Sequence, residues 1–254
     1  METVRRAVRY VLVVTGTAAI AVAGSGNPGL AAVSSPSATF TAAMIEPARG
    51  EVVGVAQPVV VRFSEPIADR PAAERTIAVT SSRNVTGRFA WLNDDVVQWI
   101  PDGFWPAHSQ IKVTAGGAST SFESGAAVVG VADLSAHTFT VSIDEQVVRE
   151  MPASMGKPGF ATPVGTFSAL QKQRNVTFDS RTIGIPLDSA EGYLIQGQYG
   201  VRVTWGGVYV HSAPWSVGSQ GRANVSHGCI NLSPDNAAWY FNTVRVGDPI
   251  IVQS

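Results

Sequence analysis

Cysteine is almost absent from this chain of 254 residues, which contains a single one, Cys229. A lone cysteine excludes an internal disulfide, and it excludes the zinc sites that are built from cysteine pairs. Charge is also scarce, because Asp, Glu, Lys and Arg together make up 15% of the residues and the formal net charge is -1. The chain has no basic field that would attract nucleic acid, so we expect no nucleic-acid partner.

Long-range sequence patterns are missing as well. The chain has no internal repeat, heptad pattern, P-loop, GxGxxG or CxxC motif, so it lacks the signatures of repeat proteins, coiled coils and common nucleotide-binding folds. It does have 45% hydrophobic residues, with 25 glycines and 15 prolines. This composition favours many short strands joined by turns over long helices, and we predict a mainly β fold.

A long hydrophobic run is also lacking, and the nearest approach to one lies at the N-terminus. Arginines cluster among the first nine residues, an uncharged segment follows over residues 10–23, and the small residues Leu30-Ala31-Ala32 come next. This order is typical of an export signal. Fourteen helical residues span about 21 Å, less than the roughly 30 Å of a membrane core. We predict that residues 1–32 are an export signal, or alternatively an N-terminal anchor, and that residues 33–38 are a linker.

Residues 39–125 show short strand-like runs separated by turn residues, without helical periodicity. The turn sequence Asn93-Asp94-Asp95 predicts a hairpin between two of these runs. Together the runs predict a small antiparallel β-sandwich. The predicted strands are 59–63, 76–81, 87–91, 96–100 and 111–115.

Three tryptophans in this region, Trp91, Trp99 and Trp105, form a set that at first sight suggests carbohydrate stacking. Trp99, however, lies in an alternating strand, and large aromatic residues commonly fill sandwich cores. We predict core packing for these residues, with carbohydrate stacking as the alternative.

The second region, residues 126–254, is predicted to be a β-rich domain with one helix. Two strand-like runs flank Asp144-Glu145, which predicts a hairpin with a solvated acidic turn rather than a catalytic carboxylate pair. Ser233 and Pro234 predict a helix start, and the helix continues through Phe241. The predicted strands are 138–143, 146–151, 165–169, 201–205, 208–211 and 249–252.

The only cysteine lies close in sequence to two of the four histidines, His211 and His227. A free thiol, with a pKa of about 8.5, is mostly protonated at neutral pH, so an imidazole that takes its proton activates it as a nucleophile. Gly228 permits a tight turn beside Cys229, and turn amides are natural donors to an oxyanion. This pattern favours a catalytic thiol over buried filler or an intermolecular disulfide, the alternatives for a lone exported cysteine.

Here the sequence resembles a known family. The segment Ser226-His227-Gly228-Cys229-Ile230-Asn231, preceded by a histidine at position 211, is similar to the signature of the YkuD-type L,D-transpeptidases. The resemblance covers the second region, including Thr162-Pro163-Val164-Gly165. The first region, with Trp99-Ile100-Pro101, resembles the immunoglobulin-like domain that precedes the catalytic domain in mycobacterial members.

The resemblance implies a cysteine acyltransferase. It makes Cys229 the nucleophile and His211 the general base, with the backbone carbonyl of Ser212 orienting the imidazole. The backbone amides of His227, Gly228 and Cys229 would stabilise the oxyanion. The His227 side chain is expected to be a structural or substrate-side group rather than a second base.

The resemblance also places four side chains along a substrate channel, namely Asn231, Ser226, Trp215 and Tyr193. Tyr193 maps to a mobile flap that runs roughly over residues 175–198. From the residues alone, Asn231 has an alternative as a turn cap, and Trp215 as a core residue.

The implied reaction is a ping-pong acyl transfer between peptidoglycan stems in the periplasm or cell wall. The thiol attacks the bond after the third residue of a tetrapeptide donor stem, D-Ala leaves, and the amine of an acceptor stem resolves the thioester into a 3→3 cross-link. No cofactor is implied, and carbapenem β-lactams are the expected covalent inhibitors. Two alternatives stay open, an L,D-carboxypeptidase and a non-catalytic wall-binding module.

A zinc site is a further alternative, because His211, His227 and Cys229 are residue types that bind zinc. The sequence has no HExxH motif and no cysteine pair, and zinc would occupy the thiol that the reaction needs. We expect no metal. The remaining histidines, His108 and His137, are predicted to be structural.

Overall fold

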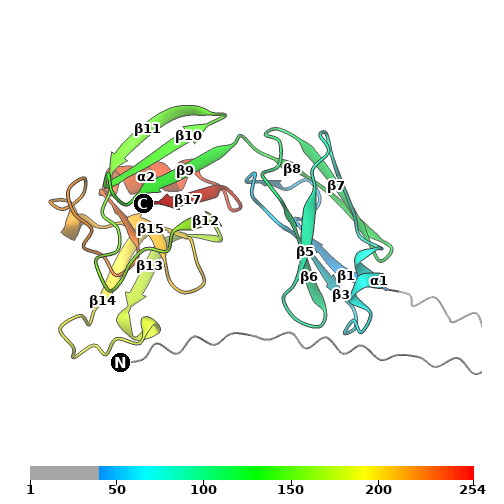
Figure 1. The fold of residues 1–254 in the computed structure, drawn as a ribbon, viewed down its shortest axis with the longest axis horizontal. Helices are drawn as coiled ribbons and strands as arrows, with labels where there is room; N and C mark the ends of the chain where they lie inside the picture. Colours follow the sequence, from blue (N-terminus) through cyan, green and yellow to red (C-terminus); the bar gives the residue numbers. More distant parts are fainter. Residues whose placement is uncertain (1–39) are drawn as a thin grey trace, which may run out of the picture. The chain divides into compact units, whose positions relative to one another are not determined.

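The computed structural model describes residues 40–254, so the predicted export segment and linker lie outside the described residues. The described chain forms two groups of strands, one drawn in blue to green and the other in green to red (Figure 1). Strands dominate both groups, which confirms the predicted mainly β fold. Within residues 40–254, no helix is long and apolar enough to span a membrane.

The first domain consists of two four-stranded sheets, with the orders β1-β3-β6-β5 and β2-β8-β7-β4. The strands of one sheet are β1 (Ala42–Glu46), β3 (Val59–Phe63), β5 (Gly87–Trp91) and β6 (Val96–Pro101). Those of the other are β2 (Val52–Val53), β4 (Ala78–Ser81), β7 (Gln110–Ala115) and β8 (Ala118–Ser124). All five predicted strands are present, and β1, β2 and β8 are additional to the prediction.

The core of this domain lies between its sheets. Along β7 every second residue is buried, which places Ile111, Val113 and Ala115 inside. Trp99 and Trp105 are also buried, and their rings stack with centroids 5.2 Å apart. The prediction of core packing for these two tryptophans is confirmed.

The structure differs from the prediction at a short helix, α1 (Arg70–Glu74), where the sequence shows no helical periodicity. Five residues make little more than one turn, which is too short for a periodic pattern. The helix is stabilised at its N-terminus, where the Asp69 side chain accepts a hydrogen bond from the backbone N–H of Ala72. Trp91 is half-buried and packs against the core of this domain, and its indole N–H donates to Glu74 Oε1 at 2.7 Å.

The second domain contains a five-stranded sheet of order β11-β10-β9-β17-β12 and a four-stranded sheet of order β13-β14-β15-β16. The strands of the larger sheet are β9 (Val128–Asp133), β10 (Thr138–Ile143), β11 (Gln146–Pro152), β12 (Gly165–Ser168) and β17 (Pro249–Gln253). Those of the smaller sheet are β13 (Gln171–Asp179), β14 (Leu194–Arg202), β15 (Tyr209–Ser212) and β16 (Ile230–Leu232). One helix, α2 (Pro234–Thr243), and two 3₁₀ turns at Ser180–Ile183 and Pro214–Ser216 complete it.

The predicted hairpin at the start of this domain is confirmed. Ile143 of β10 pairs with Gln146 of β11, which leaves a two-residue turn. Asp144 and Glu145 both have positive φ, at 48° and 70°, as a type I′ turn requires. Both residues are exposed, so the acidic pair is a solvated turn.

Helix α2 begins where the sequence predicts. Ser233 Oγ accepts a hydrogen bond from the backbone N–H of Asn236, and Pro234 occupies the first turn. On the buried face, the Tyr240 ring meets Phe139 edge-on at 4.8 Å between centroids. The helix therefore closes the hydrophobic core of the second domain, to which both aromatic residues belong.

The smaller sheet differs most from the prediction. The strand expected at 201–205 instead runs over Leu194–Arg202 and pairs antiparallel with β13. Strand β13 is polar, and Val176 is the one buried residue among its nine, so it shows little hydrophobic alternation in the sequence. The predicted flap over residues 175–198 thus includes two paired strand ends, and its irregular part is the segment between them, called here the 180–193 loop.

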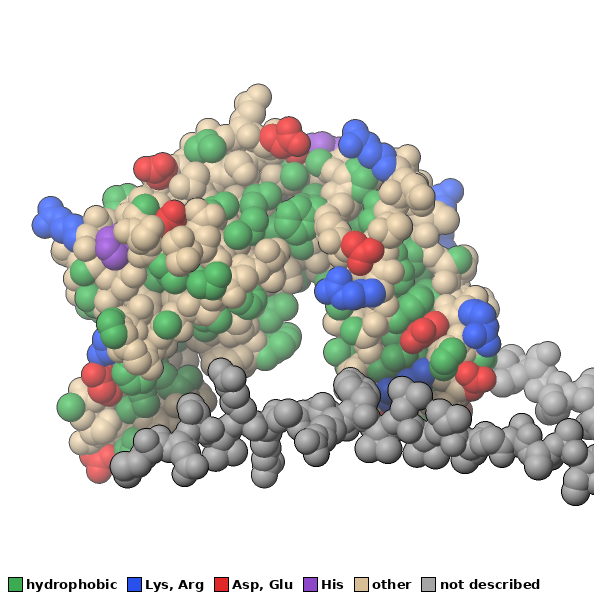
Figure 2. Space-filling model, in the orientation of Figure 1, with side chains coloured by type: hydrophobic (Ala, Val, Ile, Leu, Met, Phe, Trp, Pro, Cys, Tyr) green, Lys and Arg blue, Asp and Glu red, His purple; other side chains and the backbone are tan. Residues whose placement is uncertain are grey.

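Acidic and basic side chains are scattered over the face shown in Figure 2, and that face has no large patch of one sign. The described residues form several ion pairs near the surface, such as Arg62 with Asp95 at 2.9 Å. This distribution agrees with a formal net charge of -1.

Backbone hydrogen bonds join the two domains at Gly54. Its N–H donates to the Val246 carbonyl at 2.9 Å, and the Ala56 N–H donates to Gly247 at 2.7 Å. A Cβ added at Gly54 would lie 2.0 Å from the backbone nitrogen of Asp248. This distance is far inside van der Waals contact, so the close approach of the two backbones requires glycine.

Substitution of Gly54 by alanine is expected to lower the free energy of unfolding by about 1–3 kcal/mol, the usual cost of overpacking. Thermal unfolding followed by circular dichroism measures the change. Gly103→Ala is the matched control, because nothing lies within 4 Å of a Cβ at that position. Equal unfolding temperatures for the two variants would contradict the expectation.

Candidate active site

A cavity of about 360 Å³ in the second domain contains most of the residues that the sequence singles out. Its walls come from the 180–193 loop, β15, the turn at Pro214–Ser216 and the segment around Cys229. The predicted site residues that line it are Tyr193, His211, Trp215, Ser226, His227, Cys229 and Asn231. Ser212 and Gly228 adjoin these residues in the chain and take part through backbone atoms.

His211 lies on β15 and is only 3% exposed. Its Nδ1 is 2.8 Å from the backbone oxygen of Ser212. Because a carbonyl oxygen only accepts, the hydrogen of the neutral ring is on Nδ1, and Nε2 carries a free lone pair. The ring packs against Phe178 and Trp215, at 4.3 and 5.9 Å between centroids. This environment holds the imidazole in the tautomer in which Nε2 is the basic nitrogen.

The pKa of His211 also suits an imidazole that acts as a base. Burial lowers it to about 4, while the hydrogen bond to the Ser212 carbonyl and the polar side chain of Asn231 act in the opposite direction. Burial is the larger effect, so the imidazole is neutral at neutral pH. A neutral imidazole can take a proton, which an imidazolium cannot.

Cys229 is half-buried in the same cavity. Burial of its sulfur raises the pKa of the thiol to about 11, although the nearby Tyr209 backbone lowers it in part. Within the described part of the chain, the hydrogen bond that Sγ makes is to the Gly207 carbonyl, at 3.6 Å. The resting cavity thus holds a neutral thiol and the neutral imidazole of His211, rather than a thiolate and an imidazolium.

The segment of residues 226–229, called here the cysteine loop, is stabilised by hydrogen bonds of nearby side chains. Ser226 is buried, and its Oγ donates to the Cys229 carbonyl at 2.7 Å and accepts from the Gly228 N–H at 3.1 Å. Thr162 Oγ1 donates to the Gly228 carbonyl at 2.9 Å. Gly228 has a φ of 113°, a conformation that a residue with a Cβ rarely adopts. Ser226, which the sequence assigns to the substrate channel, therefore also fixes the turn.

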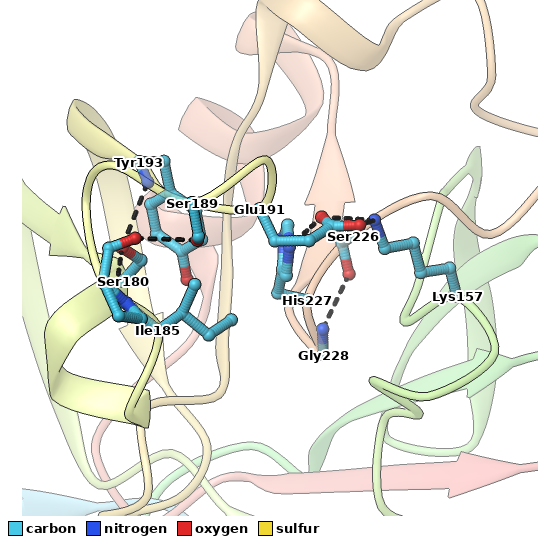
Figure 3. A network of polar contacts seen from close by, with 10 residues as sticks. Lys157, Ser180, Ile185, Ser189, Glu191, Tyr193, Ser226, His227 and Gly228 are labelled. Carbon is cyan, nitrogen blue, oxygen red and sulfur yellow. Dashed lines mark hydrogen bonds and ion pairs between the residues drawn. The ribbon is translucent and has the colours of Figure 1, made fainter.

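The 180–193 loop is closed at its base by Ser180, which is fully buried. The Ser180 backbone N–H donates to the Tyr193 carbonyl at 2.9 Å, and the Tyr193 N–H donates to Ser180 Oγ at 3.1 Å. Ser180 Oγ in turn donates to the Ile185 carbonyl at 2.9 Å (Figure 3). These bonds hold Tyr193 at the cavity, with its ring 5.0 Å from the His227 ring.

A second set of contacts joins the 180–193 loop to the cysteine loop. Glu191 accepts hydrogen bonds from Lys157 Nζ at 2.6 and 2.8 Å and lies 2.8 Å from His227 Nε2 (Figure 3). The Lys157 backbone N–H donates to the Ser226 carbonyl at 3.0 Å, so this lysine is itself fixed to the cysteine loop. The pKa of Glu191 is lowered, first by the hydrogen bond from Lys157 and then by His227.

Lys157 and Glu191 were not indicated by the sequence, although Glu191 lies two residues before Tyr193. The two residues are 34 positions apart, and no local motif contains both. Phe178, which packs on His211, is likewise an isolated aromatic residue in a polar strand. These contacts are created by the tertiary fold.

Substitution of Glu191 by glutamine is expected to speed hydrogen exchange in the 180–193 loop. Glutamine keeps the size of the side chain but removes the charge that attracts Lys157 and His227. In the unmodified chain the pKa of Glu191 is lowered, so the carboxylate stays charged and keeps these contacts at pH values below the ordinary carboxyl pKa. The contacts are lost as pH falls through the lowered pKa. Deuterium uptake of peptides covering the loop measures the effect.

The matched control for this exchange experiment is Glu145→Gln, because Glu145 is an exposed residue of the β10–β11 turn. We expect no change in the 180–193 loop for the control. If the Glu191 and Glu145 variants exchange equally, the carboxylate does not hold the loop.

The structure does not arrange His211, His227 and Cys229, the alternative zinc ligands, as a metal site. Among residues 40–254, no group of three or more His, Cys, Asp and Glu side chains is arranged to hold a metal ion. His227 Nε2 is directed at Glu191, and His211 Nδ1 at the Ser212 carbonyl. The other histidines contact Asp144, in the case of His108, and Asn224, in the case of His137.

The chain is similar to several known proteins over most of its length. The L,D-transpeptidase catalytic domain model, YkuD, matches residues 127–252, and a bacterial Ig domain model matches residues 5–119. L,D-transpeptidase 1 of Mycobacterium tuberculosis is 55% identical over 248 residues, which cover 98% of this chain and 99% of the relative. An L,D-transpeptidase structure from Mycobacterium smegmatis has a TM-score of 0.81 and 64% identity, and covers 85% of this chain and 99% of its own. The LD transpeptidase LdtMt1 in complex with imipenem also has a TM-score of 0.81, with 58% identity and coverage of 84% and 99%.

The similarity to this family is thus not limited to the cysteine motif but covers nearly the whole chain. Both domains match a known family model. The chain belongs to the L,D-transpeptidase family, as a member in which an immunoglobulin-like domain precedes the YkuD catalytic domain.

Proposed function

We propose that this chain forms 3→3 cross-links in peptidoglycan by cysteine acyl transfer, with tetrapeptide stems as donor and acceptor. The observation that carries the proposal is the presence of the only cysteine and a buried, neutral histidine in one cavity. A fold alone does not define a reaction, whereas this pair of side chains has a defined chemistry.

In the proposed first half-reaction, Cys229 attacks the carbonyl carbon of the third stem residue. The thiol proton passes to Nε2 of His211 as the S–C bond forms. His211 then returns the proton to the nitrogen of the leaving D-Ala, and the C–N bond breaks. The product is a thioester between Cys229 and the donor stem.

In the second half-reaction, the side-chain amine of the third residue of an acceptor stem attacks the thioester. This amine loses a proton to His211, and that proton restores the thiol when the S–C bond breaks. Atoms and charge balance without a cofactor. The carbonyl of Ser212 keeps the imidazole in the required tautomer throughout.

The backbone amides of His227, Gly228 and Cys229 are proposed as donors to the oxyanion of each tetrahedral intermediate. The Gly228 N–H donates to Ser226 Oγ at 3.1 Å, so it would exchange this partner for the oxyanion. The neighbouring side chains of Tyr193 and Trp215 line the cavity, and Trp215 is 51% exposed. They are proposed to contact the stem, together with Ser226 and Asn231.

Carbapenems are the proposed covalent inhibitors. The related LdtMt1 structure is a complex with imipenem, a β-lactam. A β-lactam carbonyl is an acyl donor whose leaving nitrogen stays tethered, so the same thiol attack would give an acyl-enzyme on Cys229. A neutral thiol and a basic imidazole in one cavity support this chemistry for both kinds of donor.

The other proposals concern the first domain and the N-terminus. We assign residues 39–125 to the immunoglobulin-like domain, as a spacer that takes no part in the chemistry, and residues 126–254 to catalysis. Residues 1–32 are proposed as an export signal or membrane anchor, with residues 33–38 as the linker. Export would bring the chain to the periplasm or cell wall, where a peptidoglycan substrate is available.

The test is incubation of the purified chain with disaccharide-tetrapeptide fragments, followed by liquid chromatography and mass spectrometry. We expect free D-Ala together with dimers linked between the third residues of two stems. Tripeptide fragments without dimers would indicate an L,D-carboxypeptidase. No product, combined with no mass increase after incubation with imipenem, would indicate a non-catalytic wall-binding module.

A further inference from the structure

The side chain of Asn231 lies beside the imidazole of His211. The two residues are partners in the parallel pairing of β15 with β16, so their side chains point to the same side of the sheet. Both residues are 3% exposed, and both line the cavity that contains Cys229. A polar side chain buried this deeply requires an explanation.

The orientation of the Asn231 amide follows from its neighbours. Ser216 Oγ donates its hydrogen to the Ala213 carbonyl at 3.2 Å, so towards Asn231 it can only accept. The Asn231 Nδ2 group supplies that hydrogen bond at 3.2 Å. The amide group is thereby fixed, with Nδ2 towards Ser216 and the carbonyl oxygen Oδ1 on the other side.

This carbonyl oxygen has no hydrogen-bond partner among the described residues, although it is buried. The neutral imidazole of His211 has only one N–H, which Nδ1 donates to the Ser212 carbonyl. A neutral ring therefore cannot satisfy a second acceptor well. An imidazolium has two N–H groups and a positive charge, and it would interact favourably with both carbonyl oxygens.

We propose that the Asn231 carbonyl oxygen stabilises the imidazolium form of His211, which exists in each half-reaction after the ring takes a proton and before it passes that proton on. This assignment rests on the proposed acyl transfer. Asn231 acts through His211, so it is a positioning residue rather than a catalytic one. An acceptor that gains its partner only during the reaction contributes more to the transition state than to the resting state.

Among residues 40–254, no charged side chain contributes to the pKa of His211. The ring is enclosed by Phe178 of β13, Trp215 and Asn231. The other titratable side chains of the cavity are Glu191, Tyr193, His227 and Cys229. The pKa of His211 is lowered by burial and raised by the Ser212 carbonyl and the nearby Asn231 side chain, and Glu191 is already bound to Lys157 and His227.

The test compares Asn231→Asp with Asn231→Leu, which have nearly the same shape. A carboxylate beside the ring is expected to raise the pKa of His211 by roughly 1–3 units. Leucine removes the acceptor, so the pKa should stay at or below its original value and acylation by imipenem at neutral pH should slow roughly tenfold or more. The readouts are the pH dependence of acylation and the titration of His211 by NMR of ¹³C-labelled histidine.

The acid limb of the acylation profile should move to higher pH in the aspartate variant and not in the leucine variant. A merely structural role for Asn231 would not produce this difference. If that limb does not move, or if the leucine variant acylates as fast as the unmodified chain, the proposal is overturned. Ser216→Ala provides a second measurement, because it frees the amide without removing the acceptor and should slow acylation less than Asn231→Leu. The NMR titration needs no turnover, so it separates failure of this assignment from failure of the proposed function.

Discussion

Replacement of Cys229 by alanine is expected to abolish D-Ala release, cross-link formation and the imipenem adduct together. All three require the S–C bond of the thioester or its β-lactam equivalent, and the chain contains no second thiol. We expect a loss of roughly 10⁴-fold or more, as for other essential nucleophiles. Intact-mass spectrometry after incubation with imipenem measures the adduct, and chromatography of stem fragments measures D-Ala.

The control for this substitution is Cys229→Ser, which restores a polar atom without a thiol. A serine hydroxyl is far harder to deprotonate than a thiol, so we expect this variant to be as inactive as the alanine variant. Circular dichroism of both variants should match that of the unmodified chain, because Cys229 is only half-buried. Appreciable D-Ala release by a folded alanine variant would rule out the thiol mechanism.

The elements that lie next to a clear turn or cap signal could be predicted from the sequence, whereas strands without one, such as β8, β9 and β13, could not. The bounds of β5 and β10 match the prediction, because each lies next to a clear turn signal, Asn93-Asp94-Asp95 or Asp144-Glu145. Helix α2 is similarly marked by Ser233 and Pro234. Strand β13 has no such pattern, since its polar side chains face solvent and its pairing with β14 is a long-range property.

The site divides in the same way. A contiguous motif indicates Cys229 and its glycine turn, and the structure places His211 in the same cavity. The contact of Glu191 with Lys157 and the buried carbonyl of Asn231 depend on which strands and loops meet, so no local pattern contains them. The protonation states also follow from burial, which raises the pKa of the thiol and lowers that of the imidazole.

The two histidines of the cavity are expected to respond differently to substitution. His211→Ala should slow acylation by roughly 10²–10⁴-fold, the usual contribution of a general base. This factor corresponds to about 3–5 kcal/mol of transition-state stabilisation. His227→Ala should have a smaller effect, because His227 Nε2 contacts Glu191 and its ring packs on Tyr193, so that it acts on the loop and the substrate side.

The pH dependence provides an independent test of the same assignment. Because burial holds the pKa of His211 at about 4, acylation by the unmodified chain should fall only as pH drops through this value, where the ring becomes protonated. This acid limb should be absent from the His211 variant and retained by the His227 variant. Acylation rates with imipenem over a range of pH measure both.

Loss of activity in His211→Ala could also arise from the cavity left by a buried ring, so a variant of similar size is needed. His211→Gln retains an N–H that can donate to the Ser212 carbonyl but has no basic nitrogen, and we expect it to be as slow as the alanine variant while unfolding at nearly the original temperature. His137→Ala is the control for loss of an imidazole elsewhere, since His137 is bonded to Asn224 and does not line the cavity. If His227→Ala slows acylation more than His211→Gln does, and removes the acid limb, then His227 is the base and the roles of the two residues must be exchanged.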